Sequence, residues 1–236
     1  MPGIWNAFFG DIVPRTMFIE VPELLTADQL ERLREIASQA NFADGRLSNP
    51  HSKVKQNLQI DHNDPLYEES AKMLAEAMMR NETVQNFAYI SRLAPPLICR
   101  YQPDMAYGKH ADAAFLPMRP TPLRSDISST IFLADPETYE GGELTIHLGN
   151  KTIVVKGQAG SAILYPSTTI HEVMPVTSGE RLVAITFIES QIMDENKRYL
   201  LYSLKEVSAL EGFNISWDNR VQLEHVCASL HRMWST

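Results

Sequence analysis

The sequence predicts a mainly β core with flanking helices, an α+β arrangement. Two observations carry this prediction. Amphipathic helical patterns occupy the first third and the end of the chain, whereas from about residue 97 short β-prone runs separated by turn signals take over. Short strands at such spacing are typical of a sandwich or barrel. We therefore expect a helical buttress over residues 1–96, the β core over residues 97–192 and a helical tail over residues 193–236.

Two helices are expected before the β core. The segment LLTADQLERLREIASQA places apolar residues at helical spacing: Leu30, Leu33, Ile36, Ala37 and Ala40. Thr26 followed by Gln29 resembles a capping box. In NDPLYEESAKMLAEAMMRN, Asp64 can cap a helix that has Pro65 at its first position. The apolar stripe of this second helix consists of Leu66, Met73, Leu74, Ala77 and Met78.

Six β-prone runs follow: PLICRYQP, SSTIFLAD, GELTIHL, KTIVVKG, SAILYP and RLVAITFIES. The turn signals between them are Asp135-Pro136, Gly141-Gly142, Gly149-Asn150, Gly157 and Ser178-Gly179. Several runs are apolar on both faces, which is expected when strands are covered by a second sheet or by helices. The tail returns to helix in ENKRYLLYSLKEVSAL and again in NRVQLEHVCASLHRMW.

Length and composition narrow the class of protein. A chain of 236 residues can build one large domain or one domain with a small appendage. The net charge of −8 argues against non-specific binding to nucleic acid or anionic membranes. Cys99 and Cys227 are too few for a disulfide framework or a thiolate zinc site, which favours a reducing compartment. The start, MPGIWNAFFGDIVPR, has no signal-peptide pattern and no long apolar span follows, so we expect a soluble cytoplasmic protein.

The segment YGKHADAAFLPMRP contains His110 and Asp112, one residue apart. In an extended segment this spacing places both side chains on one face. A second histidine would complete the 2-His-1-carboxylate arrangement that leaves positions open on non-haem Fe(II). A lone His-x-Asp pair is weak evidence, and the other histidines are the candidates for the third ligand: His51, His62, His147, His171, His225 and His231. Of these, His171 lies in the apolar segment LYPSTTIHEVMPV, between two predicted strands.

Arg181 opens the run RLVAITF, ten residues after His171. On a strand it shares one face with Val183, Ile185 and Phe187. An arginine on an apolar face is costly unless its guanidinium meets an anion. A dicarboxylate cosubstrate would be such an anion, held through two parallel hydrogen bonds.

With these motifs the sequence resembles the Fe(II)- and 2-oxoglutarate-dependent dioxygenases, specifically the bacterial PKHD-type hydroxylases, which are similar to prolyl 4-hydroxylase and are linked to iron uptake. The resemblance runs from VKQNLQI to the tail helix and is strongest in RYQPDMAYGKHADAA, RSDISSTIFLADPETYEGGEL, AGSAILYPSTTIHEVMPVTSGERLVAITFIES and RYLLYSL. It implies a double-stranded β-helix, or jelly-roll, core. It also implies that decarboxylation of 2-oxoglutarate by O2 is coupled to hydroxylation of a peptide-like or small-molecule substrate, with L-ascorbate as reductant.

The resemblance implies His110, Asp112 and His171 as the iron ligands. Arg181 matches the basic residue that binds the far carboxylate of 2-oxoglutarate, and Tyr101 matches a tyrosine that often hydrogen-bonds this carboxylate. Tyr107 matches a second pocket tyrosine, which we expect to be a wall of the pocket. Asp104 stands where prolyl hydroxylases tend to have glycine, so we do not expect a detailed copy of the substrate-facing loop.

Two alternatives stand beside this interpretation. A cupin-like metal-binding sensor could keep the ligands without catalysis, because a jelly roll does not imply an enzyme. The presence of Arg181 favours the enzyme, since a plain metal binder needs no dicarboxylate clamp. A nucleic-acid demethylase is disfavoured by the net charge. We expect Arg124 to pair with Asp126, and the apolar tail helices could support a homo-oligomer.

Overall fold

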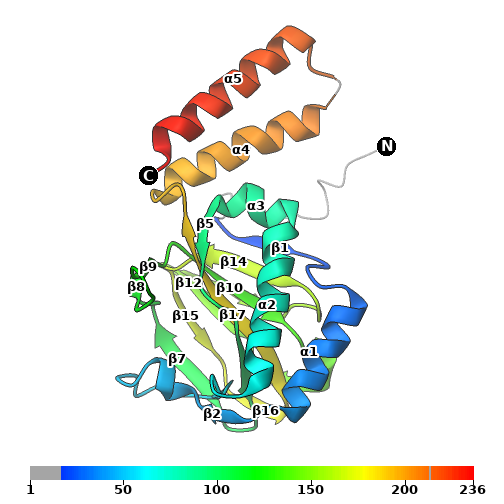
Figure 1. Cartoon of the computed structure of the whole chain (residues 1–236), viewed down its shortest axis with the longest axis vertical. Coiled ribbons are helices and arrows are strands. Elements are labelled where there is room, and N and C mark those ends of the chain that lie inside the picture. Colours follow the sequence, from blue (N-terminus) through cyan, green and yellow to red (C-terminus); the bar gives the residue numbers. More distant parts are fainter. Residues whose placement is uncertain (1–16, 213) are drawn as a thin grey trace.

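Two antiparallel β-sheets form the centre of the chain, as the computed structural model shows for residues 17–212 and 214–236 (Figure 1). The segment MPGIWNAFFGDIVPR, on which the absence of a signal peptide was predicted, lies outside these described residues. No helix within the described ranges is both long and apolar enough to cross a membrane.

The larger sheet has eight strands in the order β1-β14-β10-β17-β6-β4-β2, with β5 paired to β17. Its strands are β1 (Ile19–Val21), β2 (Phe42–Asp44), β4 (Leu58–Ile60), β5 (Ile90–Leu93), β6 (Leu97–Tyr101), β10 (Ile127–Phe132), β14 (Ala162–Pro166) and β17 (Arg181–Ser190). All six residues of β10 are buried. This strand lies between β14 and β17, and the burial of all its residues means that both of its faces are covered, which explains why its sequence is not simply alternating.

The smaller sheet has the order β13-β12-β15-β7-β3. Its strands are β3 (Lys55–Gln56), β7 (Ala106–His110), β12 (Leu144–Leu148), β13 (Lys151–Val155) and β15 (Ile170–Val173). Two short pairs accompany the sheets, β8 (Phe115–Leu116) with β9 (Leu123–Arg124) and β11 (Tyr139–Gly141) with β16 (Val176–Gly179). The short 3-10 turns are η2 (Gly45–Ser48) and η3 (Pro136–Thr138).

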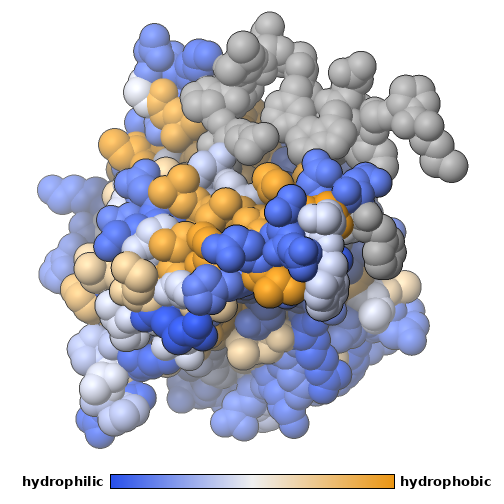
Figure 2. Space-filling model, turned by 90° about the horizontal axis from the view of Figure 1, so that it is seen from above, coloured by the Kyte–Doolittle hydropathy of each residue, from blue (hydrophilic) through white to orange (hydrophobic). Residues whose placement is uncertain are grey.

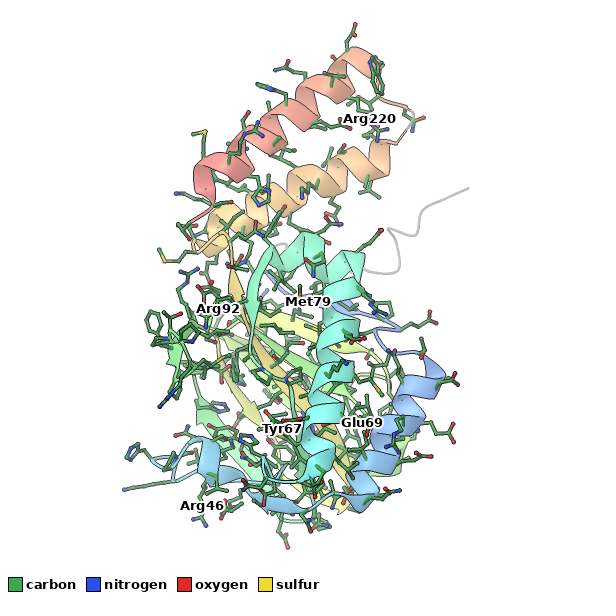
Figure 3. The ribbon with its side chains drawn as sticks, viewed as in Figure 1. Arg46, Tyr67, Glu69, Met79, Arg92 and Arg220 are labelled. Atoms are coloured by element: carbon green, nitrogen blue, oxygen red, sulfur yellow. The ribbon has the colours of Figure 1, made fainter. Side chains whose placement is uncertain are left out.

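Helices α1 (Ala27–Gln39) and α2 (Pro65–Arg80) lie over one face of the larger sheet, and the short α3 (Glu82–Ala88) follows α2 (Figure 1). The predicted capping box is confirmed, since the Gln29 amide donates to Thr26 Oγ1 and the Thr26 amide donates to Gln29 Oε1. Asp64 caps α2 as predicted. Arg32 of α1 joins the two helices through Glu69 of α2, with 2.7 Å between its Nε and the carboxylate; Glu69 is labelled in Figure 3.

The first segment is more than a helical buttress. Strands β1 to β5 all lie before residue 97 and take part in both sheets. These strands have only two to four residues each, too few to show a period-2 pattern that local sequence could reveal. The division of the chain at residues 96 and 192 stays a prediction.

The predicted tail helices are α4 (Glu195–Glu211) and α5 (Trp217–Trp234), which form a hairpin beyond α3 (Figure 1). A second small core joins them to the sheet region through Tyr89, Ile192, Leu201 and Cys227. Viewed from this end, apolar side chains gather between polar ones (Figure 2). The exposed apolar residues of the hairpin include Leu200, Val207, Leu210, Trp217, Val221 and Met233. The homo-oligomer prediction for this tail stays a prediction.

The turn between β6 and β7 contains a non-glycine residue, Asp104, in a backbone conformation that glycine usually adopts. Asp104 has a φ of 71°, in the left-handed region that asparagine and aspartate tolerate better than most residues. Its amide donates to the Val176 carbonyl at 3.0 Å. Aspartate at this position, where prolyl hydroxylases tend to have glycine, is therefore compatible with the backbone conformation of the turn.

Candidate active site

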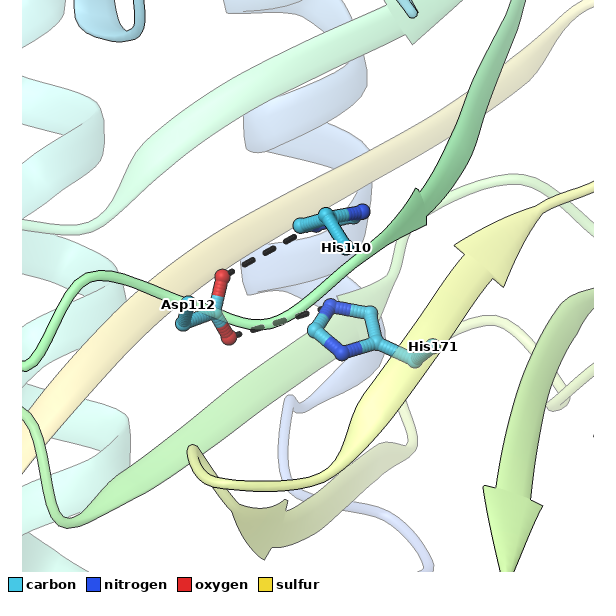
Figure 4. Close-up of side chains that lie close together, drawn as sticks. All are labelled: His110, Asp112 and His171. Carbon is cyan, nitrogen blue, oxygen red and sulfur yellow. Dashed lines mark ion pairs between the residues drawn. The ribbon is translucent and has the colours of Figure 1, made fainter. Parts of the chain in front are cut away.

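Two neighbouring strands of the smaller sheet bring His110, Asp112 and His171 together. His110 ends β7 and is paired in register with His171 of β15, while Asp112 lies two residues beyond the end of β7. His110 Nε2 lies 3.9 Å from Asp112 Oδ1, and His171 Nε2 lies 3.7 Å from Asp112 Oδ2 (Figure 4). Among the described residues, this is the set of His, Cys, Asp and Glu side chains that converges closely enough to hold a metal ion.

Hydrogen bonds to the backbone orient both imidazoles. His110 Nδ1 lies 2.8 Å from the Gly108 carbonyl oxygen, and His171 Nδ1 lies 2.9 Å from the Thr169 carbonyl oxygen. A carbonyl only accepts, so each Nδ1 carries the proton and each Nε2 keeps its lone pair free. The Ser128 hydroxyl donates to Asp112 Oδ2 at 2.5 Å and fixes the carboxylate in the same way.

The electrostatic surroundings keep His110 in the form that binds metals. Burial, and then the neighbouring His171, lower the pKa of His110 to about 4. Its imidazole is therefore neutral at pH 7, as a metal ligand must be. The Tyr107 ring stacks on it, with ring centroids 3.6 Å apart, so Tyr107 forms a wall of the site as expected.

The three side chains fit a shared divalent ion. The nitrogen–oxygen distances of 3.7 and 3.9 Å are too long for hydrogen bonds. Two ligand atoms with bonds of roughly 2.1 Å to one metal can lie up to about 4 Å apart. Two neutral imidazoles and one carboxylate also form the donor set of a facial non-haem iron site.

Arg181 faces the same pocket from the larger sheet. It is the first residue of β17, its side chain is 1 % exposed, and its register partner on β6 is Tyr101. Its guanidinium carbon lies 4.9 Å from the centre of the Tyr101 ring. Within residues 17–212 and 214–236, Arg181 Nε and Nη1 have no hydrogen-bond partner. The Tyr139 hydroxyl contacts the guanidinium, but a buried guanidinium with two nitrogens that lack partners indicates an anionic ligand.

Two buried tyrosines also line this pocket, Tyr101 and Tyr165. Burial raises the pKa of both phenols, so both hydroxyls stay protonated and can donate hydrogen bonds. The family resemblance predicted Tyr101 as a pocket residue, whereas nothing in the sequence predicted Tyr165. Tyr165 ends the apolar run SAILY, where nothing local separates it from a core residue.

The other histidines do not join this cluster. His147 is the nearest along the sheet, but Ile146 rather than His147 is the register partner of His171. Since side chains alternate along a strand, His147 points to the opposite face, where it contacts Glu172 at 2.8 Å. The structural role predicted for Arg124 is confirmed, because it forms two hydrogen bonds of 2.8 and 2.9 Å with Asp126.

Polar residues that the sequence analysis did not select complete the pocket. They include Lys55, Asn57 and Ser128. Lys55 and Asn57 alternate in VKQNLQI, a polar pattern that is normally typical of a solvent-exposed strand face. Only the pairing of β3 with β7 shows that this face points inward.

Comparisons with known proteins agree with this geometry. Residues 96–189 match the family model of the 2OG-Fe(II) oxygenase superfamily. A PKHD-type hydroxylase of Sphingopyxis alaskensis is 49% identical over 212 residues, which is 90% of this chain and 97% of that protein. A PKHD-type hydroxylase of Alteromonas mediterranea is 40% identical over 92% of this chain and 99% of that protein. The site and fold thus define a 2OG-Fe(II) oxygenase, and within that superfamily the chain belongs to the PKHD-type hydroxylases.

Solved structures confirm the predicted jelly-roll fold. A Pseudomonas putida prolyl-4-hydroxylase has a TM-score of 0.52 at 18% identity and covers 75% of this chain and 94% of that one. The Trichoplax adhaerens prolyl hydroxylase, solved with a hypoxia inducible factor peptide fragment, has a TM-score of 0.54 at 16% identity, with coverages of 79% and 87%. At these identities the likeness establishes the fold alone.

Proposed function

We propose that the chain hydroxylates a peptide-like or small-molecule substrate, using Fe(II) held by His110, Asp112 and His171 and 2-oxoglutarate held by Arg181. One observation carries the proposal. The fully buried guanidinium of Arg181, which lacks partners on two of its nitrogens, shares a pocket with the His-Asp-His cluster. A buried unpaired cation is unfavourable until an anion binds, and a dicarboxylate that reaches both the metal and Arg181 would be that anion.

Bound Fe(II), with O2 and 2-oxoglutarate, supplies oxidative decarboxylation to succinate and CO2 coupled to transfer of one oxygen atom to the substrate. The residues of the chain supply orientation. The backbone carbonyls of Gly108 and Thr169 hold the two imidazoles, and Ser128 holds the carboxylate of Asp112. The planar fork of Arg181 matches a carboxylate through two hydrogen bonds, and its burial keeps water from competing.

The cupin-like alternative differs in what it requires of the pocket. A metal-binding sensor needs the His-Asp-His cluster but has no use for a buried unpaired arginine. The deciding experiment loads the protein with Fe(II) under anaerobic conditions, titrates 2-oxoglutarate by calorimetry and then admits air. We expect saturable binding, followed by succinate formation that depends on Fe(II) and O2. Iron binding with neither 2-oxoglutarate affinity nor succinate would favour the sensor.

The proposed substrate class follows the range seen in structural relatives. The Trichoplax adhaerens structure contains a peptide fragment. HygX from Streptomyces hygroscopicus, with a TM-score of 0.50, was solved with hygromycin B. The net charge of −8 argues against a nucleic-acid substrate here.

Three further assignments belong to this proposal. L-ascorbate is the reductant that returns Fe(III) to Fe(II), and a higher yield of succinate per iron in its presence would support this assignment.

The location is cytoplasmic, in agreement with two buried free cysteines, Cys99 and Cys227. The apolar residues exposed on α4 and α5 form the contact between copies of the chain in a homo-oligomer.

Tyr101→Phe is expected to weaken 2-oxoglutarate binding about fivefold. The hydroxyl lines the pocket and remains a donor, and a net hydrogen bond contributes roughly 1 kcal/mol. Anaerobic titration of 2-oxoglutarate into the Fe(II)-loaded variant measures this change. The matched control is Tyr89→Phe, since Tyr89 is equally buried but belongs to the second core near α4. Unchanged affinity in Tyr101→Phe would assign Tyr101 to packing.

A further inference from the structure

A stripe of buried polar side chains crosses from β3 to β4 on the inner side of the sheets. Lys55, Asn57 and Gln59 occupy alternate positions and are only 5 %, 4 % and 3 % exposed. Polar residues at this depth are unfavourable unless they have partners. Lys55 and Asn57 line the pocket that also holds the His-Asp-His cluster and Arg181.

The ammonium of Lys55 has one hydrogen-bond partner in the described part of the chain. It donates to Ser48 Oγ at 2.7 Å, and it lies 5.4 Å from the centre of the Tyr107 ring. An ammonium has three donors, so two remain for a ligand. Among the described residues, no carboxylate lies within 4.0 Å of Lys55 Nζ. Burial lowers the pKa of Lys55, as expected for a cation without a close counter-ion.

The Cys99 thiol lies beside the Asn57 side chain, but the Asn57 amide has no nitrogen or oxygen partner within residues 17–212 and 214–236. Both Oδ1 and Nδ2 are buried and without hydrogen bonds. The turn η2 holds it in place, because the Gly45 amide donates to the Asn57 carbonyl at 2.8 Å and a side chain at Gly45 would collide with the Asn57 amide. The same turn presents Ser48 to Lys55, so one structural unit positions both residues. Arg46 marks this turn in Figure 3.

The charges of the pocket indicate what these residues bind. Lys55 and Arg181 are the cations that line it, and Asp112 is the carboxylate. A divalent metal adds two positive charges, which bound 2-oxoglutarate matches with its two carboxylates. The pocket then retains one positive charge in surroundings where an unpaired charge is costly. A carboxylate of the primary substrate at Lys55 would offset this charge, whereas a second contact from a carboxylate of 2-oxoglutarate would give the Lys55 ammonium a close anionic partner without changing the net charge.

We propose that Lys55 and Asn57 form a second carboxylate-binding pair in this pocket, in addition to Arg181. The carboxylate accepts hydrogen bonds from the Lys55 ammonium and the Asn57 amide. The proposal rests on the proposed function for the identity of the ligand at Arg181. The carboxylate has two possible sources, a second contact to 2-oxoglutarate or a carboxylate of the primary substrate, and two measurements distinguish them.

The first measurement is anaerobic titration of 2-oxoglutarate into Fe(II)-loaded wild type, Lys55→Met and Lys55→Gln. If the carboxylate belongs to 2-oxoglutarate, both variants bind it at least tenfold more weakly than wild type. Glutamine can keep the hydrogen bond to Ser48 but has no charge, so it separates anion binding from local structure. Lys53→Met is the matched control, because Lys53 lies two residues away and is exposed.

The second measurement uses acetate as a probe for a separate carboxylate. Mn(II)-loaded protein, saturated with 2-oxoglutarate, is titrated with acetate, and the relaxation of the methyl protons by Mn(II) reports an acetate bound near the metal. If the carboxylate belongs to the primary substrate, wild type and Lys53→Met relax acetate saturably. In Lys55→Met and Asn57→Ala, most or all of the saturable relaxation of acetate is then lost, while the affinity of these variants for 2-oxoglutarate stays unchanged.

Every outcome decides the proposal. Weaker 2-oxoglutarate binding or loss of acetate relaxation in the Lys55 variants supports it and identifies the source. The proposal is overturned if the Lys55 variants bind 2-oxoglutarate like wild type and Lys55→Met and Asn57→Ala also relax acetate like wild type, with Tm values verifying that the variants are folded. If wild type itself binds no 2-oxoglutarate, the proposed function fails, and the acetate titration of the Mn(II)-loaded protein alone still decides whether Lys55 and Asn57 bind a carboxylate.

Discussion

His171→Ala is expected to abolish stoichiometric Fe(II) binding and, with it, succinate formation. The imidazole supplies one of three converging donor groups, and among the described residues its Nε2 has no hydrogen-bond partner that would explain its position otherwise. Loss of outer partners of a metal site alone costs 10–100-fold in affinity, so loss of a ligand should cost more than about a hundredfold. Anaerobic equilibrium dialysis with Fe(II) measures the change, and circular dichroism with Tm verifies that the jelly roll remains.

His147→Ala is the matched control for this prediction. His147 lies on β12, next to the strand that carries His171, and its partner is Glu172 on the opposite face. It should bind one Fe(II) per chain like wild type. Unchanged iron stoichiometry in His171→Ala would contradict the ligand assignment. Zinc or nickel is expected to compete for the site during aerobic purification, because both bind such donor sets more tightly than Fe(II) does.

The fold could be predicted where the sequence pattern is long enough to be informative. Helices α1 and α2 have caps and apolar stripes, β17 has a long apolar run, and β10 has a β-prone sequence bounded by turn signals. The strands before residue 97 could not be predicted, because each has at most four residues and its state depends on pairing partners far along the chain. Tertiary pairing, not local preference, determines such segments.

The candidate site shows the same limit at single residues. The spacing of His110 and Asp112 predicted that their side chains lie together. Arg181 could be predicted to bind an anion, because it is a cation on an apolar strand face. The choice between His147 and His171 depends on register, since a shift by one residue exchanges the two faces of a strand. Lys55 has the local pattern of an exposed strand, and only the packing of β3 against β7 makes it a buried cation.

Arg181→Leu is expected to remove 2-oxoglutarate binding while leaving Fe(II) binding intact. Lysine keeps the charge but loses the planar fork, and leucine loses both, so affinity should fall in the order wild type, Arg181→Lys, Arg181→Leu. Loss of a charge-assisted pair in a closed pocket costs on the order of 2–4 kcal/mol, or roughly 30- to 1,000-fold in Kd. Two anaerobic titrations on each variant, Fe(II) first and 2-oxoglutarate second, measure both affinities.

Arg100→Leu is the matched control, since Arg100 lies on the neighbouring strand β6 and points to the opposite face. Its Nη2 donates to the Ala37 carbonyl at 2.6 Å, and its Nε lies 3.2 Å from Glu180. This variant should keep its 2-oxoglutarate affinity, with any loss confined to stability. Equal 2-oxoglutarate affinity in wild type and Arg181→Leu would exclude the clamp.

Stability provides an independent measurement of the same residue. A structural ion pair that loses one partner destabilises a protein strongly, by about 3–5 kcal/mol. Arg181 has no carboxylate partner in the described residues, and its Nε and Nη1 are unsatisfied. Replacing this buried charge by leucine should therefore leave the Tm of the ligand-free protein unchanged or raise it. Added Fe(II) and 2-oxoglutarate should then stabilise wild type more than Arg181→Leu, because only wild type gains the binding free energy of the anion. A large loss of Tm in ligand-free Arg181→Leu would instead assign the guanidinium to the folded core.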